Sequence, residues 1–447
     1  MRHAFAADPR PAKSRTVALA AAPAVSVPLG FFVPAVVLLA AAAASLPFLA
    51  PKMADWYYQQ EILAAVHTLT LGFVLAVFLG ASVQLLPVVS GRSVERTGLV
   101  RAATLLFFAG ALGMVLHFFR FRWDGLLVSA ALLIGAVVVF LVAMAPLLLA
   151  PERDDAQLGL LLAFVGLVLT MAAGFVLGLN RRSAFLPGAP LDHLAAHLHL
   201  GLLATFGVAI FGVESKLLPM FLIAAPPNAR RQRAALLLLF GGALLLAVAL
   251  WFSLPAAPFA LLVLVAIVLQ IVNVREMLAS RRRKEIDAGF LYALSAYADL
   301  VAAGLVGLAW SLGLGKGTAL PIRLAWLYGF LLLVGFVVQT VVGILSKILP
   351  FVVWNATYAR RVGVSPVPML RDLSSETLQR VGFVLFRVSS ILLAVALLRG
   401  HAGELRAASA LFAVALVPFL LHVARVLSHL VRPLQPLTTE VPHAGSR

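Results

Sequence analysis

The sequence predicts an all-α membrane protein with twelve transmembrane helices, arranged as three four-helix units around a pseudo-threefold axis. The first observation behind this prediction is composition. Hydrophobic residues make up 62% of the chain and charged residues only 12%, and the mean hydropathy is +1.02. Soluble domains carry about 25% charged residues. The second observation is an eight-residue phrase, Gly-x-x-x-[Lys/Gln]-[Leu/Ile]-Leu-Pro, which closes a long apolar run three times. Together these observations indicate a repeated helical bundle inside a membrane.

The three copies of this phrase, at residues 80–87, 212–219 and 343–350, are almost evenly spaced. Their glycines lie 132 and 131 residues apart (212 − 80 and 343 − 212). A constant period indicates a repeated structural unit. The structural interpretation of the phrase is that glycine lets helices approach closely, Lys or Gln reaches toward water, and proline ends or kinks the span. The alternative is a functional role for its buried Lys.

Twelve apolar runs reach the length of about 20 residues that a membrane-spanning helix needs. They form one membrane domain between a tail of residues 1–24 and a tail of residues 428–447. The predicted units cover about 25–149, 157–278 and 289–427. The runs lie at roughly 25–50, 60–89, 99–118, 125–149, 157–179, 191–223, 234–254, 259–278, 289–313, 324–354, 378–398 and 406–427.

The basic residues predict the orientation of the spans. With both termini cytoplasmic, the inner segments and adjoining helix ends hold 23 Lys and Arg residues, whereas the outer ones hold 9. An excess of positive charge marks the cytoplasmic side. The formal net charge of +17 therefore belongs to loops between spans, and it does not indicate nucleic-acid binding. In this orientation the repeated phrases lie at the inner ends of spans 2, 6 and 10.

The chain contains no cysteine. This absence excludes disulfides, thiolate-bound metals, iron–sulfur clusters and haem attached through Cys-x-x-Cys-His. Any haem or metal must therefore be held by His, Met, Tyr or carboxylate side chains.

Histidines concentrate at the outer ends of spans 2 and 6. His67 and His199 each lie 20 residues before the proline of their phrase (87 − 67 and 219 − 199), so the repeat predicts that they occupy equal depths. The third copy has Phe330 at this position and Tyr328 two residues earlier, where the second copy has His197. We expect His67 and His199 to be the axial ligands of one haem, with nitrogens about 4 Å apart across the iron.

Four further histidines are candidate metal ligands. His193 and His197 are separated by one helical turn and could bind one metal ion from a shared helix face. His199 is rotated by about 200° from His197 and points elsewhere. His117 and His401, also outer, are candidates for a third ligand. The alternative is that these are ordinary interfacial histidines.

Five charged side chains fall inside the predicted spans. A charge at membrane depth is expected to pair or to face water, and it is a candidate for function. The two alternatives are structural ion pairs, formed with partners on other helices, and a proton path. The five residues are Glu214, Lys216, Asp299, Lys347 and Arg387.

The twelve spans in three arcs, with histidines near the outer ends of spans 2 and 6, resemble subunit I of the haem-copper oxidase and nitric oxide reductase superfamily. The stretches beginning His67-Thr-Leu-Thr-Leu and His197-Leu-His-Leu, each continuing to Leu-Leu-Pro, are also similar to divergent subunit-I-like bacterial membrane proteins. The resemblance implies that His67 binds a low-spin haem and that His197 or His199 is the counterpart of a copper ligand. It also implies location in a bacterial inner membrane.

The sequence departs from the superfamily in its remaining ligands. Span 7 has no histidine pair, span 10 has no His-x-His, and no tyrosine follows the span 6 histidines by one turn. The full oxygen-reducing centre is therefore not expected. What the resemblance still implies is one haem, of b type, with or without one copper. The chain is also similar to the haem- and copper-containing membrane proteins of the nitric-oxide response, which are a closer functional analogue than the oxidases.

The leading hypothesis is thus a haem-binding protein of the respiratory type, which handles electrons or a small gas such as nitric oxide or oxygen at the outer face. A cytochrome or cupredoxin would be its electron donor, and a second copy or a respiratory subunit its partner in the lipid bilayer. Two alternatives remain open. One is a copper-binding or transporting protein, and the other is an assembly subunit that kept the fold without a cofactor.

Overall fold

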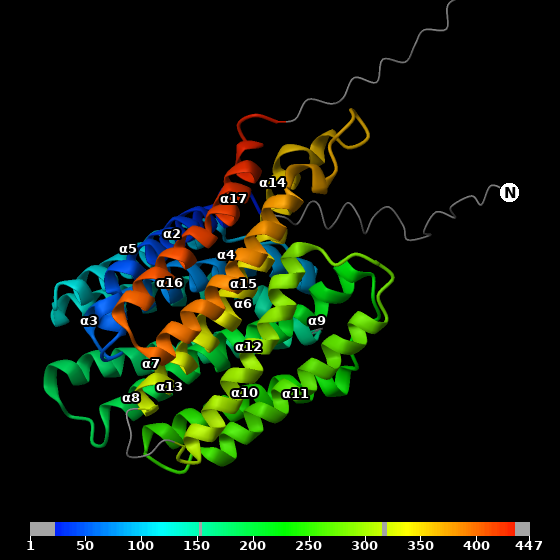
Figure 1. Ribbon diagram of the computed structural model, residues 1–447. Helices are drawn as coiled ribbons and strands as arrows, with labels where there is room; N and C mark the ends of the chain where they lie inside the picture. Colours follow the sequence, from blue (N-terminus) through cyan, green and yellow to red (C-terminus); the bar gives the residue numbers. More distant parts are fainter. Residues whose placement is uncertain (1–22, 152–153, 315–319, 434–447) are drawn as a thin grey trace, which may run out of the picture.

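The computed structural model describes residues 23–151, 154–314 and 320–433, and these residues contain helices and no strands. The predicted N-terminal tail lies almost wholly outside the described residues, and so does most of the predicted C-terminal tail. Twelve helices are long and apolar enough to cross a membrane, as the sequence predicts. They lie side by side in one bundle (Figure 1).

Nine of the twelve spans are single or nearly continuous α-helices. The first four of these are α2 (Ser26–Met53), α5 (Thr97–Phe119), α6 (Trp123–Leu148) and α7 (Asp155–Ser183). The others are α10 (Ala229–Trp251), α11 (Ala257–Ala279), α12 (Ala288–Ser311), α15 (Glu376–Arg399), and the last span, made of α16 (Ala402–Ala415) and α17 (Val417–Ser428). Short 3₁₀ turns η4 (Ala359–Arg361) and η5 (Leu370–Leu373) precede α15.

Spans 2, 6 and 10 are different, because each contains a π-helical segment between two α-helical parts. Span 2 is α3 (Gln60–His67), η1 (Thr68–Leu75) and α4 (Ala76–Ser90). Span 6 is α8 (Pro190–His199), η2 (Leu200–Gly207) and α9 (Val208–Leu222). Span 10 is α13 (Leu320–Phe330), η3 (Leu331–Val338) and α14 (Gln339–Thr357).

The π segments follow the period of the sequence. Each has 8 residues, and their first residues lie 132 and 131 positions apart (200 − 68 and 331 − 200). The π-helix is rare and occurs mostly as single-turn bulges inside α-helices, frequently at functional sites. Each begins directly after the repeat position that holds His67, His199 or Phe330. The grouping of the twelve spans into three four-helix units stays a prediction.

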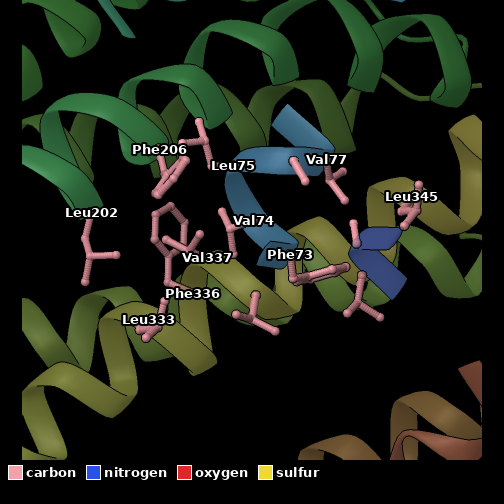
Figure 2. Close-up of a cluster of buried hydrophobic side chains, with 14 of the residues drawn as sticks. Phe73, Val74, Leu75, Val77, Leu202, Phe206, Leu333, Phe336, Val337 and Leu345 are labelled. Carbon is pink, nitrogen blue, oxygen red and sulfur yellow. The ribbon is translucent and has the colours of Figure 1, made fainter. Parts of the chain in front are cut away.

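These three spans form the centre of the molecule. In their most apolar windows 61%, 72% and 78% of the residues are buried, against 28–44% in the other nine spans. The π segment η3 contacts both η1 and η2, and the apolar side chains gathered there include Val74 from η1, Phe206 from η2 and Phe336 from η3 (Figure 2). α3, α8 and α13 lie toward one end of the bundle, and α4, α9 and α14 toward the other (Figure 1). We call these the histidine end and the phrase end.

The glycine of each phrase lies against the span that precedes it. A side-chain carbon at Gly212 would lie 2.7 Å from Cα of Gly159 on α7. At Gly343 it would lie 2.3 Å from the carbonyl oxygen of Gly289 on α12. At Gly80 it would meet aromatic side chains of α2. Close helix approach is therefore the role of this glycine in all three copies.

The phrase lysines also bind the preceding span. Lys216 Nζ lies 2.9 Å from Oδ2 of Asp154, and Lys347 forms an ion pair with Asp287. Asp154 and Asp287 are the N-cap residues of α7 and α12, and their side chains accept backbone N–H groups there. The two lysines thus have structural partners on other helices, which was one of the two alternatives for them.

We expect Gly343→Ala to destabilise the protein strongly. The added methyl group meets backbone atoms of α12, which cannot rotate away, and overpacking of this kind costs about 1–3 kcal/mol. Gly241→Ala in α10 is the matched control, because a side-chain carbon there has no neighbour within 4 Å. The midpoint of thermal unfolding in detergent should fall for Gly343→Ala alone. Equal midpoints for the two variants would contradict the tight contact.

Candidate functional site

A cavity of about 710 Å³ lies at the histidine end, where spans 2, 6 and 10 begin. This volume is within the range of about 300–1,000 Å³ that is usual for ligand sites. Most of its wall consists of aliphatic and aromatic side chains from spans of all three sequence periods. The polar and aromatic side chains that line it include Tyr57, Tyr58, His67, Thr70, Trp123, Thr170, Arg181, Asp192, His197, His199, Trp310, Trp326 and Tyr328.

His67 and His197 face this cavity with the same arrangement of hydrogen bonds. Nδ1 of His67 lies 2.8 Å from the carbonyl oxygen of Leu63, and Nδ1 of His197 lies 3.0 Å from that of Thr170. A carbonyl oxygen only accepts, so each Nδ1 carries the proton and each Nε2 keeps its lone pair. Both side chains line the cavity and are only partly buried. Metal-binding histidines are typically oriented by such a bond from the other ring nitrogen.

The two rings come from different spans and line the same cavity. His197 reaches from α8 to α7, where Gly174 leaves room for it. A side-chain carbon at Gly174 would lie 2.9 Å from Cε1 of His197. The ring of His67 lies 4.9 Å from that of Phe118 on α5. Their positions are therefore fixed by close packing as well as by hydrogen bonds.

His199 shares the repeat position of His67 but has a different environment. Its Nδ1 lies 2.7 Å from the carbonyl oxygen of Ala195, four residues earlier, just as His67 contacts Leu63. Its Nε2, however, accepts a hydrogen bond of 2.7 Å from the hydroxyl of Tyr328 on α13. Both ring nitrogens of His199 are thus occupied. Of the two span 6 candidates, His197 and not His199 offers a free nitrogen beside His67.

Arg181 supplies a positive charge on the cavity wall near the end of α7. Its Nε donates to the hydroxyl of Tyr58 at 3.1 Å, and its guanidinium carbon lies 4.3 Å from the centre of that ring and 5.8 Å from that of Trp123. These contacts orient the guanidinium group beside an aromatic wall. Nearby, burial first and the charge of Asp192 second raise the pKa of Tyr57, so this phenol stays neutral. Carboxylate groups of a ligand could pair with Arg181.

The other candidate metal ligands are not gathered into one site. His193 is buried against Trp251 with ring centroids 4.8 Å apart, and its Nδ1 has no hydrogen-bond partner. His117 hydrogen-bonds to Ser129 at 3.1 Å, and His401 is the exposed N-cap residue of α16. Within the part of the chain that the structure describes, no three His, Asp or Glu side chains are placed to share a metal ion.

The remaining charged side chains within spans are partnered across helices. Asp299 on α12 forms an ion pair with Arg387 on α15, and Arg387 also donates to Oε1 of Gln339 at 2.8 Å. Glu214 on α9 accepts hydrogen bonds from Tyr297 and from Gln270, the latter at 3.4 Å. No cation in the described residues forms an ion pair with Glu214.

Sequence reasoning did not identify Arg181, Thr170 and Gly174 as parts of the site. Nothing in the sequence distinguishes Arg181 from its neighbour Arg182, which forms an exposed ion pair with Asp124. The sequence did indicate that Tyr328 belongs near the histidines, because it occupies the repeat position of His197. That position predicted its height along the bundle but not its hydrogen bond to His199.

Comparison of the chain with protein-family models gives no match, and comparison with curated proteins gives none either. The residues of the cavity are therefore the basis for assigning a function.

Proposed function

We propose that this membrane protein binds one haem of b type in the cavity at the histidine end, with His67 and His197 as the two axial ligands. The observation that carries the proposal is the matched pair of imidazoles. Each has its Nδ1 proton bound to a carbonyl oxygen, and each leaves Nε2 free toward one cavity. Imidazole is a common ligand for haem iron.

The cavity suits a haem in size, polarity and charge. Its volume of about 710 Å³ and its largely apolar wall match a large, flat, apolar ligand. Arg181 at the wall would pair with the carboxylates of the haem propionates. The absence of cysteine means that the haem would be held without thioether bonds. Copper is not part of the proposal, because no set of three ligating side chains is found among the described residues.

Two imidazole ligands point to electron transfer rather than to gas chemistry. When bound between two histidines, haem supplies one-electron redox chemistry, and gas binding would require one of these ligands to leave. The backbone carbonyls of Leu63 and Thr170 hold the two rings in the tautomer that ligation needs. The apolar wall would exclude water from the cavity. We further propose that the chain is a distant relative of oxidase subunit I, which the twelve spans and the period of the π segments support.

The visible spectrum of the detergent-purified protein, measured together with metal analysis, tests the proposal. We expect about one haem per chain and a six-coordinate, low-spin Soret band in both the oxidised and the reduced state. Carbon monoxide should leave the reduced spectrum unchanged, because both axial positions are occupied. Copper or zinc without haem would instead support a metal-handling protein. A protein that contains neither haem nor metal, even after incubation with haemin, would support the assembly subunit.

A further inference from the structure

Glu214 is a carboxyl group buried in the membrane half that faces the phrase end. Only 2% of the residue is exposed. Its Oε2 accepts hydrogen bonds from the hydroxyl of Tyr297 on α12 and from Nε2 of Gln270 on α11. Its Oε1 is buried and has no partner. This carboxyl group lies outside the cavity at the histidine end and has no part in the proposed haem site.

The charged groups around Glu214 do not neutralise it. Those on neighbouring helices are engaged elsewhere: Lys216 with Asp154, Arg233 with Asp155, Arg231 with Glu276, Lys347 with Asp287, and Arg387 with Asp299. Arg275 on α11 is exposed at the surface of the bundle. Among the described residues, the titratable group hydrogen-bonded to the carboxyl is the hydroxyl of Tyr297. An ionised carboxylate without a cation is very costly at such depth, so the protonated acid is the favoured form.

The neighbouring amide supports this assignment. Oε1 of Gln270 is buried without a donor, just as Oε1 of Glu214 is. These two oxygen atoms lie on side chains that contact each other, and both lack a hydrogen-bond donor. A carboxylic acid O–H or a bound water supplies such a donor. The orientation of an amide group is an assignment from its hydrogen bonds, and a flipped Gln270 would present its oxygen to the acid.

A ladder of polar side chains leads from this pair to the phrase end. Gln270, Asn273 and Glu276 follow at intervals of three along α11, about 4.5 Å per step, and so lie near one face. Nδ2 of Asn273 donates to Oε1 of Gln232 at 2.9 Å, and Nε of Arg231 donates to Oδ1 of Asn273 at 2.6 Å. Arg231 ion-pairs with Glu276, whose side chain is 55% exposed. Polar side chains therefore lead inward from the surface to Asn273 and Gln232, and Gln270, which contacts the carboxyl, lies one turn further along α11.

In the opposite direction the surroundings of Glu214 are apolar. The ring of Tyr297 is covered by Phe211 and Phe336, each with its ring centroid 6.2 Å away. Beyond them lies the packed cluster of the three π segments, where Phe206 and Phe336 come together (Figure 2). This cluster separates Glu214 from the cavity at the histidine end.

From this geometry we infer that Glu214 is a proton-binding site that exchanges its proton only with water at the phrase end. In the exchange the carboxyl O–H bond breaks, and the proton passes to water molecules held by the amides of Gln270, Asn273 and Gln232. The carboxylate that remains keeps its hydrogen bonds from Tyr297 and Gln270. This site does not depend on the proposed haem.

Dicyclohexylcarbodiimide tests the protonation state, because it adds to buried carboxylic acids in their protonated form. We expect a covalent adduct on Glu214, located by mass spectrometry of the purified protein at neutral pH. Glu214→Gln should eliminate the adduct, and Asp299, which is paired with Arg387, is the internal control without one. As an independent measurement, the infrared carbonyl band of a protonated acid should disappear in Glu214→Gln. Absence of both the adduct and the band would overturn the assignment.

Deuterium exchange of the same infrared band tests the route. Asn273→Leu interrupts the ladder and should slow the exchange at Glu214 at least tenfold. Ser389→Ala, which removes an equally buried polar group on α15, should leave the rate unchanged. An unchanged rate in Asn273→Leu would overturn the ladder as the path. Size-exclusion profiles identical to the wild type would show that both variants are folded.

Discussion

Replacing His67 or His197 by alanine should remove the low-spin haem spectrum, whereas His199→Ala should retain it. The free Nε2 atoms of His67 and His197 face one cavity, but the Nε2 of His199 accepts the hydroxyl of Tyr328. Without one of these two imidazoles, a bound haem would be held by a single histidine or would be lost from the protein. Haem per chain and the position of the Soret band are the quantities to measure. We expect at least a tenfold loss of low-spin haem in either of the first two variants.

Chemical rescue provides a sharper form of this experiment. His197→Gly leaves a gap beside Gly174, and added imidazole should restore the low-spin spectrum by filling it. Tyr328→Phe is the matched control, because it removes the hydrogen bond to Nε2 of His199 without changing the two proposed ligands. This variant should keep the low-spin spectrum. Loss of haem in His199→Ala, with full retention in His197→Ala, would reverse the assignment within span 6.

Deleting Leu203 from the π segment η2 is expected to abolish the site and to destabilise the fold. Removal of one residue from a segment that keeps its helical form shortens the span by one residue. The parts of span 6 on either side would then turn by about 100° relative to each other and approach by about 1.5 Å. Either His197 leaves the cavity, or Gly212 leaves its contact with Gly159. The first outcome should appear as a loss of haem, and the second as a lower midpoint of thermal unfolding.

The control for this deletion is Leu200→Ala, which truncates a buried side chain of the same segment, outside the cavity lining, without changing the length of the helix. Truncation of a buried leucine costs about 2–5 kcal/mol but should leave the orientation of His197 intact. The truncated variant should therefore still bind haem, while the deletion variant should not. Normal haem content in the deletion variant would show that the π geometry does not orient the histidines.

The positions of the spans could be predicted from the sequence because membrane crossing imposes a minimum apolar length. Predicted runs at 60–89, 191–223 and 324–354 correspond to helical spans Gln60–Ser90, Pro190–Leu222 and Leu320–Thr357. The role of the phrase glycine could also be predicted, since small residues let membrane helices approach each other. The periodic spacing predicted which residues occupy equivalent positions, and the shared hydrogen bonding of His67 and His199 agrees with it.

The neighbours of each histidine could not be predicted in the same way. A helical wheel gives the angle between His197 and His199, but the neighbouring helix that each one faces is set by packing between spans distant in sequence. Thr170 and Tyr328 are 27 and 129 residues away from their histidine partners. The π segments were also not predicted, because an apolar run has the same composition in either helical form. Residues at equivalent repeat positions could therefore be predicted to lie at equal depth, but their hydrogen-bond partners could not be predicted.

The contacts of the phrase with the preceding span have a consequence for how the protein is made. In span 6, Gly212 packs against Gly159 and Lys216 forms an ion pair with Asp154. In span 10, Gly343 packs against Gly289 and Lys347 forms an ion pair with Asp287. Each of these phrases therefore contacts the span synthesised just before its own. Lys216 and Asp154 are only 62 residues apart in a chain of 447. Contacts that are close in sequence form early, and domains emerge from synthesis N-terminal part first. Three pairs of spans can therefore form helical hairpins as they enter the membrane, namely spans 1 and 2, spans 5 and 6, and spans 9 and 10. The cavity at the histidine end is completed only when the last three spans arrive, because Tyr328, Leu393 and Phe412 line it.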